Sequence, residues 1–163
     1  MTEAVSAPLP PGARDFDFLL GAWRVHHRRL ERRLAGSKNW AEFGGTMRAE
    51  PILGGLGNFD WNHIDLPEGR YQASTLRLFN PRLASWSLHW VDGRDPKLDP
   101  PLTGTFSDGI GRFFGDDMFE GLPIGVRFLW THDGADSARW EQAFSADAGA
   151  SWETNWIMEF TRA

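Results

Sequence analysis

Two histidines of the chain stand where an imidazole could do chemistry, His27 and His63. An imidazole titrates near neutral pH, so either ring could act as a general acid or base or could orient the polar end of a bound molecule. His63 follows Asp60 and Trp61 and is the better candidate. A histidine whose ring nitrogens are satisfied within a packed core is the plainer interpretation of His63. Which residues, if any, are catalytic stays unknown from the sequence.

The pair His26-His27 does not predict a metal site. Adjacent residues of a strand point to opposite sides, and two ligands of one metal on a strand are better spaced as His-x-His, a pattern that does not occur here. The chain has no cysteine, which excludes disulfides, thiolate nucleophiles and zinc–cysteine sites. We therefore expect no metal site and no cofactor.

Arg77 stands between Thr75 and Phe79, in a segment whose apolar residues alternate with polar ones. An arginine turned into an apolar interior is costly unless it is paired. An inward Arg77 is therefore expected to meet a carboxylate or the anionic group of a ligand. An outward arginine on a solvated face is the alternative.

β-Strands must position these side chains, because large aromatic residues recur with a spacing of two. Trp86-x-Leu88-x-Trp90 is one example, and Trp152-x-Thr154-x-Trp156-x-Met158-x-Phe160 is another. This period puts alternate side chains on one face of a strand. Turn signals such as Asn80-Pro81 and Asp92-Gly93 separate the apolar segments. The expected strands cover residues 22–34, 39–50, 56–64, 70–79, 85–91, 101–107, 111–119, 124–131, 138–146 and 152–162.

Sequential strands joined by short turns predict an all-β fold, a single closed antiparallel up-and-down β-barrel of about ten strands. A sheet of this length closes because closure removes its exposed edges. Such a barrel is wide enough to hold one small ligand. We expect a flexible N-terminal tail at residues 1–13 and one barrel domain at residues 14–163 that begins with a short helical turn. An open β-sandwich or jelly roll is the alternative architecture.

Two short signatures bracket the expected barrel, Gly21-Ala22-Trp23 at the start of the first strand and Phe160-Thr161-Arg162 at the end of the last. They resemble the G-x-W signature and the C-terminal arginine of the lipocalin/calycin superfamily. Together with Gly55-Leu56-Gly57-Asn58-Phe59-Asp60 and Trp152 to Trp156, they make the chain similar to an uncharacterised bacterial family of lipocalin-like barrels. The resemblance implies a barrel like those of lipocalins and fatty-acid-binding proteins, closed by Arg162 packed over Trp23. It implies fold rather than function, because such barrels serve unrelated ligands.

Strict alternation from Trp23 and Arg162 predicts which side chains face the interior. It places Val25 and His27 inside on the first strand. It also places Trp152, Thr154 and Trp156 inside on the last strand, whose phase a single β-bulge would invert in part. Elsewhere the bulkier face of a strand is taken as the inner one, which puts Phe59, Trp61 and His63 inside. The expected ligand-binding residues are then His27, Trp61, His63, Arg77, Trp90, Trp130, Gln142 and Trp156.

An interior of aromatic rings with a few polar groups has the general form of a small-molecule site. We therefore expect the barrel to bind a small hydrophobic or aromatic ligand. A barrel enzyme of isomerase, cyclase or hydrolase type, with a cavity histidine as general acid or base, is the first alternative. Haem binding, by comparison with haem-binding calycins related to nitrobindin, is the second. A dimerising module with Trp40 and Phe43 on its outer face is the third.

The composition of the chain limits the classes of partner that we expect. The net charge of −5 and the pI of about 5.5 argue against nucleic acid and against an anionic membrane surface. No apolar run is long enough to span a bilayer, and the N-terminus lacks the features of a signal peptide. We therefore expect a cytoplasmic protein without membrane insertion, and we leave open whether it forms a homodimer.

Overall fold

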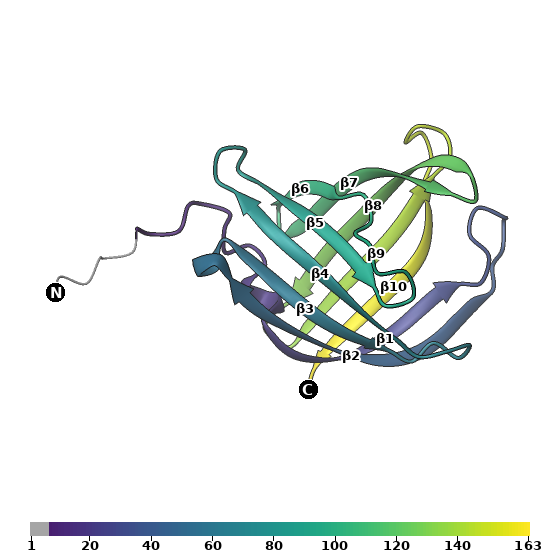
Figure 1. Ribbon diagram of the computed structural model, residues 1–163, viewed down its shortest axis with the longest axis horizontal. Helices are drawn as coiled ribbons and strands as arrows, with labels where there is room; N and C mark the ends of the chain where they lie inside the picture. The colour runs from purple at the N-terminus through teal and green to yellow at the C-terminus, as the bar shows by residue number, and fades with distance from the viewer. Residues whose placement is uncertain (1–6) are drawn as a thin grey trace.

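The computed structural model describes residues 7–163, which form a closed antiparallel barrel of ten strands (Figure 1). Each strand pairs with its neighbours in the sequence, and the first strand pairs with the last. The all-β, up-and-down architecture predicted from the sequence is confirmed. The strands are β1 (Gly21–Leu30), β2 (Trp40–Ile52), β3 (Gly57–Ile64), β4 (Tyr71–Asn80), β5 (Ser85–Asp92), β6 (Leu102–Ser107), β7 (Ile110–Phe119), β8 (Leu122–Asp133), β9 (Ser137–Ser145) and β10 (Glu153–Arg162).

Helical structure is confined to two short 3₁₀ helices, η1 (Asp17–Leu19) and η2 (Leu53–Gly55), within the described chain. The η1 helix lies where the sequence predicts a helical turn, at one end of the barrel (Figure 1). Neither helix approaches the length and apolarity that crossing a membrane requires, and the same holds throughout residues 7–163.

Trp23 and Arg162 are paired in register across β1 and β10. The guanidinium carbon of Arg162 lies 3.7 Å from the centroid of the Trp23 ring. Its nitrogens donate hydrogen bonds to the carbonyls of Leu20, Phe18 and Ala135 at 2.6, 2.9 and 2.9 Å. One side chain thus ties together the N-terminal segment, the β8–β9 turn and the last strand.

Phe16, which precedes η1, fills the closed end of the barrel from inside. Its side chain is only 1% exposed. Its ring lies 4.9 to 5.9 Å, centroid to centroid, from Trp86, Phe106, Phe113 and Trp130. Three of these contacts are edge-on, an arrangement that aromatic quadrupoles favour. The N-terminal segment is therefore part of the core.

The expected flexible tail at residues 1–13 contacts the barrel before residue 14. Ala13 is buried, and the carbonyl of Gly12 accepts a hydrogen bond of 3.2 Å from the indole nitrogen of Trp86. Residues 1–6 of that expected tail lie outside the described residues.

The inner face of β1 is as predicted, with Val25 and His27 buried, but the predicted inner face of β3 is wrong. Trp61 is 39% exposed and His63 is exposed, so both lie on the outer wall. The buried positions of this strand carry polar residues, Asn58, Asp60 and Asn62. The bulky side chains of β3 lie on the outer face because the polar side chains of its inner face hydrogen-bond to a buried arginine on β4.

A β-bulge in β10 overturns the prediction that Trp152 and Thr154 face the interior. The register between β10 and β9 shifts between Thr154 and Trp156. On the N-terminal side of this shift, Thr154 pairs with Ala143. Trp152 instead packs on the outer wall, where its ring centroid lies 5.9 Å from that of exposed Phe114. Trp156 and the residues after it keep the predicted phase.

Replacing Arg162 with alanine tests the closure. We expect Arg162→Ala to lower the free energy of unfolding by about 2–3 kcal/mol, because three charge-assisted hydrogen bonds and a cation–π contact are lost together. Urea denaturation measures the change. The control is Arg112→Ala, which removes an exposed arginine of β7. Equal, small effects of the two substitutions would contradict the closing role.

Candidate functional site

The interior of the barrel contains two spaces of very different size. The larger, which we call the mouth cavity, has a volume of about 190 Å³ and lies toward the end of the barrel opposite η1. The smaller, the inner cavity, has a volume of about 20 Å³. Trp90, Phe128 and Trp140 line both spaces and so form the wall between them.

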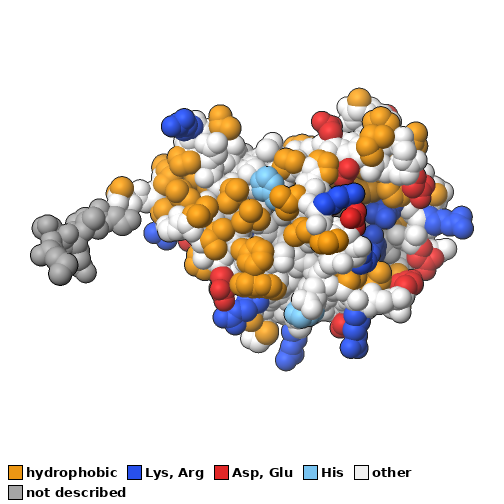
Figure 2. Space-filling model, in the orientation of Figure 1, with side chains coloured by type: hydrophobic (Ala, Val, Ile, Leu, Met, Phe, Trp, Pro, Cys, Tyr) orange, Lys and Arg blue, Asp and Glu red, His pale blue; other side chains and the backbone are white. Residues whose placement is uncertain are grey.

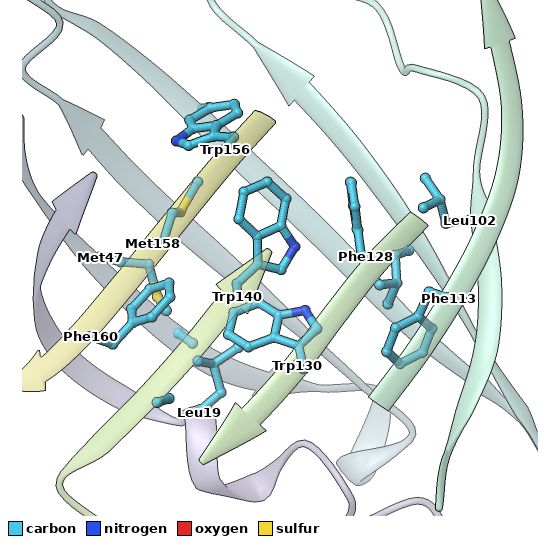
Figure 3. Close-up of a cluster of buried hydrophobic side chains, with 14 of the residues drawn as sticks. Leu19, Met47, Leu102, Phe113, Phe128, Trp130, Trp140, Trp156, Met158 and Phe160 are labelled. Atoms are coloured by element: carbon cyan, nitrogen blue, oxygen red, sulfur yellow. The ribbon is translucent and has the colours of Figure 1, made fainter. Parts of the chain in front are cut away.

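Three tryptophans from three strands shape the deep part of the mouth cavity. The ring of Trp156 meets those of Trp90 and Trp140 edge-on, at centroid distances of 5.9 and 5.4 Å. Figure 3 shows Trp156 on β10 beside Trp140 on β9, above the rings that fill the closed end. Gln142 adds a polar group, and its amide donates a hydrogen bond of 2.8 Å to Asn155, the residue between Thr154 and Trp156 where the register shifts. The floor of the mouth cavity is therefore aromatic and consists of indole rings in edge-to-face contact.

His27 supports this floor from behind but lines neither space. The indole nitrogen of Trp156 donates a hydrogen bond of 3.1 Å to its Nδ1 atom, and Phe43 stacks on its ring at 4.8 Å. Burial, followed by the charges of His26 and Arg29, lowers the pKa of His27 to about 4. His27 is therefore neutral near pH 7, and with Nδ1 accepting, its proton sits on Nε2. Phe43, predicted to lie on the outer face, is buried inside.

Arg77 is buried in the interior and paired with a carboxylate, as an inward orientation requires. Its guanidinium donates to Asp60 at 2.6 Å and to Asn58 at 2.9 Å. The other carboxylate oxygen of Asp60 accepts from the Asn62 amide at 2.8 Å and from the Thr75 backbone at 2.7 Å. This network neutralises the charge of Arg77 within the protein, so a ligand is not needed to do so.

The sequence-predicted ligand-binding residues thus fall into four groups. Trp90, Gln142 and Trp156 line the mouth cavity. Arg77 and Trp130 line the inner cavity. His27 lies behind the floor, and Trp61 and His63 lie on the outer wall, away from both spaces.

Two arginines that sequence reasoning missed stand at the opening of the mouth cavity, Arg29 and Arg33. Arg29 follows Val25 and His27 on the inner face of β1, so continued alternation from Trp23 could have found it. Arg33 belongs to the loop between β1 and β2, where no period applies. Burial lowers the pKa of both groups, that of Arg33 to about 10, and both remain charged at neutral pH.

Acidic residues line the same opening, namely Asp92, Asp99, Asp116 and Asp117. Asp92 is paired with Arg94, whose guanidinium donates to it at 3.0 and 3.2 Å. Burial raises the pKa of Asp99, and the charges of Asp117 and Asp92 raise it further. Within the part of the chain that the structure describes, no three His, Asp or Glu side chains are grouped to hold a metal ion. These carboxylates are therefore interpreted as a polar edge of the opening.

The positions of the histidines bear on two of the alternatives. A general acid or base must reach a bound substrate, and a haem needs an axial ligand. Among residues 7–163 no histidine lines the mouth cavity. His27, the buried one, already accepts the Trp156 N–H at Nδ1. Among the described residues, therefore, no histidine is placed in the mouth cavity as an axial haem ligand or as an acid–base group.

Comparison with known proteins supports the fold alone. No family model matches the sequence, and no curated protein is recognisably similar to it. Among solved structures, the chain is similar to the crystal structure of Rv2717c from M. tuberculosis. The TM-score is 0.59 at 10% sequence identity, and the match covers 96% of this chain and 99% of the other. The likeness extends over nearly the full length of both chains and shows a similar fold.

The buried pair of Arg77 and Asp60 predicts a double-mutant signature. Asp60→Leu leaves a buried guanidinium uncompensated and should lower the free energy of unfolding by about 3–5 kcal/mol. The double variant Asp60→Leu/Arg77→Leu should lose less than Asp60→Leu alone, as measured by urea denaturation. The control Glu50→Leu, from an exposed pair with Arg48, should cost no more than about 1 kcal/mol. A double variant less stable than Asp60→Leu would contradict this account.

The low pKa of His27 predicts how stability depends on pH. The unfolded chain takes up the His27 proton near pH 6.5 and the folded protein only near pH 4. The free energy of unfolding should therefore fall as the pH drops through this window, by up to about 3 kcal/mol from this group. His27→Gln keeps an acceptor for Trp156 and should flatten the profile, whereas His26→Gln on the outer face should not. An unchanged profile in His27→Gln would contradict the assignment.

Proposed function

We propose that this protein binds a small hydrophobic or aromatic molecule in the mouth cavity. The main support is a cavity of about 190 Å³ that is lined by Trp90, Trp140 and Trp156 and opens at one end of the barrel. Aromatic walls with a few polar groups are the usual composition of a small-molecule site. Ordinary core packing leaves few voids larger than a water molecule. A space of this size inside an otherwise filled barrel supports a binding role.

The volume of the mouth cavity limits the size of the ligand. Benzene occupies an apolar cavity of about 150 Å³ in a well-studied engineered protein. The mouth cavity is slightly larger, so one ring with substituents, or two fused rings, is the body that we propose for the ligand. A larger molecule would have to extend through the opening, past Arg29 and Arg33.

We also propose that the barrel is lipocalin-like. The packing of Arg162 over Trp23 supports this, because the G-x-W signature and the C-terminal arginine come together as the resemblance implies. The likeness to Rv2717c supports a shared barrel architecture and carries no function. Cytoplasmic location and a homodimer stay predictions. Exposed Trp61 on the outer wall is a place to look for a contact between copies, and Figure 2 shows hydrophobic side chains over the wall that faces the viewer.

Filling the cavity tests the proposed function. We expect isothermal titration calorimetry to detect binding of 2-naphthoate, its neutral amide 2-naphthamide, or both. Val126→Trp adds a large ring at a position that lines the mouth cavity and should abolish that binding. The control Leu129→Trp places the same ring on the outer face of the same strand and should leave binding intact. Thermal unfolding of both variants establishes that they fold.

If neither compound binds, or if Val126→Trp binds as the native protein does, the mouth cavity is not a binding site. Loss of binding in Leu129→Trp as well as in Val126→Trp would also contradict the proposal, provided that both variants are folded.

A further inference from the structure

Arg29 and Arg33 lie at the mouth cavity without an acidic partner. Among residues 7–163 no carboxylate oxygen lies within 4.0 Å of either guanidinium. Both cations lie over aromatic rings instead. The guanidinium carbon of Arg29 is 4.8 Å from the centroid of Trp156, and that of Arg33 is 4.8 Å from that of Phe119. Cation–π contacts of this kind position a charge without neutralising it.

The two guanidinium groups are held in place by neighbouring elements, a strand and a loop. Arg29 is fixed by β1, where it pairs with Trp156 in register. Arg33 is in the loop that follows β1, and its neighbour Leu34 donates a backbone hydrogen bond of 2.6 Å to Glu153 at the start of β10. The hydrogen bond to Glu153 anchors the loop to the wall of the barrel. The geometry of the pair is therefore built by strand and loop together.

Tyr71 contacts Arg94, one of the residues that line the opening, but does not itself line the mouth cavity. Its side chain is 8% exposed, and its hydroxyl has no hydrogen-bond partner among the described residues. Arg94 stacks on its ring at 3.7 Å. Burial raises the pKa of Tyr71, the charges of Arg94, Arg29 and Arg33 lower it, and the charge of Asp92 raises it.

The opening is lined by charges of both signs. The carboxylates whose charges act on the two arginines, Glu68 and Asp92 for Arg29 and Glu120 for Arg33, all lie beyond ion-pair distance. Figure 2 shows charged side chains of both signs gathered toward the right-hand end of the molecule. Arg29 and Arg33 are therefore cations of a mixed opening whose carboxylates do not form ion pairs with them.

We propose that the mouth cavity takes an amphipathic anion, with an aromatic or apolar body on the tryptophan floor and a carboxylate or phosphate between Arg29 and Arg33. A planar guanidinium matches either group through paired hydrogen bonds, and partial burial strengthens them. The anion would neutralise two cations that have no ion-pair partner among the described residues. This inference depends on the proposed function and narrows it to one class of ligand.

Three probes with the same ring system separate charge from shape. Calorimetry of 2-naphthoate, 2-naphthyl phosphate and 2-naphthamide measures the affinity for a carboxylate, a phosphate and a neutral group. We expect at least one anion to bind at least about ten-fold more tightly than the amide, the value of one good charge-assisted contact. The tighter of the two anions identifies which acidic group the site prefers.

Matched variants assign the effect to the two arginines. Arg29→Gln and Arg33→Gln should each weaken the preferred anion about ten-fold and leave the amide within about two-fold. Arg32→Gln removes an exposed arginine of the same loop, which does not line the mouth cavity, and should change nothing. If a variant fails to fold, the anion-to-amide ratio of the native protein still decides the question.

Equal binding of all three probes by the native protein would overturn the inference while leaving the proposed function standing. Binding of none of them would end both. A preference for anions that survives in Arg29→Gln and in Arg33→Gln would also overturn the inference, because the charge would then be recognised elsewhere.

Discussion

The hydrogen bond from the Trp156 indole to Nδ1 of His27 is the interaction on which the site depends. It fixes the Trp156 ring, whose edge contacts with Trp90 and Trp140 make the cavity floor and whose face carries Arg29. Because His27 is buried and neutral, it can serve as an acceptor at no electrostatic cost near pH 7. The histidine is thus a positioning residue rather than a reactive one.

A second constraint decides how much of the barrel stays open. A closed barrel directs every inward side chain into one space, and here the closed end is filled by Phe16 from the N-terminal segment and by the ion pair of Arg77 with Asp60. Asn58, Asn62 and Thr75 hydrogen-bond the pair, the Arg77 Nε atom has no partner among the described residues, and a water-sized space lies beside it. The mouth cavity, which has room for a ligand, lies beyond the tryptophan floor. Charge that the protein leaves unpaired lies there too, on Arg29 and Arg33.

Local pattern was sufficient to predict the strands, because period two and turn residues act within a few positions of each other. The pairing of Trp23 with Arg162 could be predicted as well, and so could the inward phase of β1. The inner face of β3 could not be predicted. Asp60 is buried there because it pairs with Arg77, so the size of the side chains does not indicate which face of this strand is the inner one. The bulge at Asn155 reverses Thr154 without any local signal. Arg33 is placed by a loop contact with Glu153 that only the folded chain reveals.

An aromatic anion is expected to enter this barrel ring first, with its acidic group at the two arginines. A crystal structure with 6-bromo-2-naphthoate tests this binding mode, because the anomalous signal of bromine locates the far end of the ring. We expect bromine at the floor formed by Trp90, Trp140 and Trp156, and the carboxylate within hydrogen-bond distance of Arg29 or Arg33. Bromine at the opening, on the outer wall near Trp61, or absent altogether would contradict it.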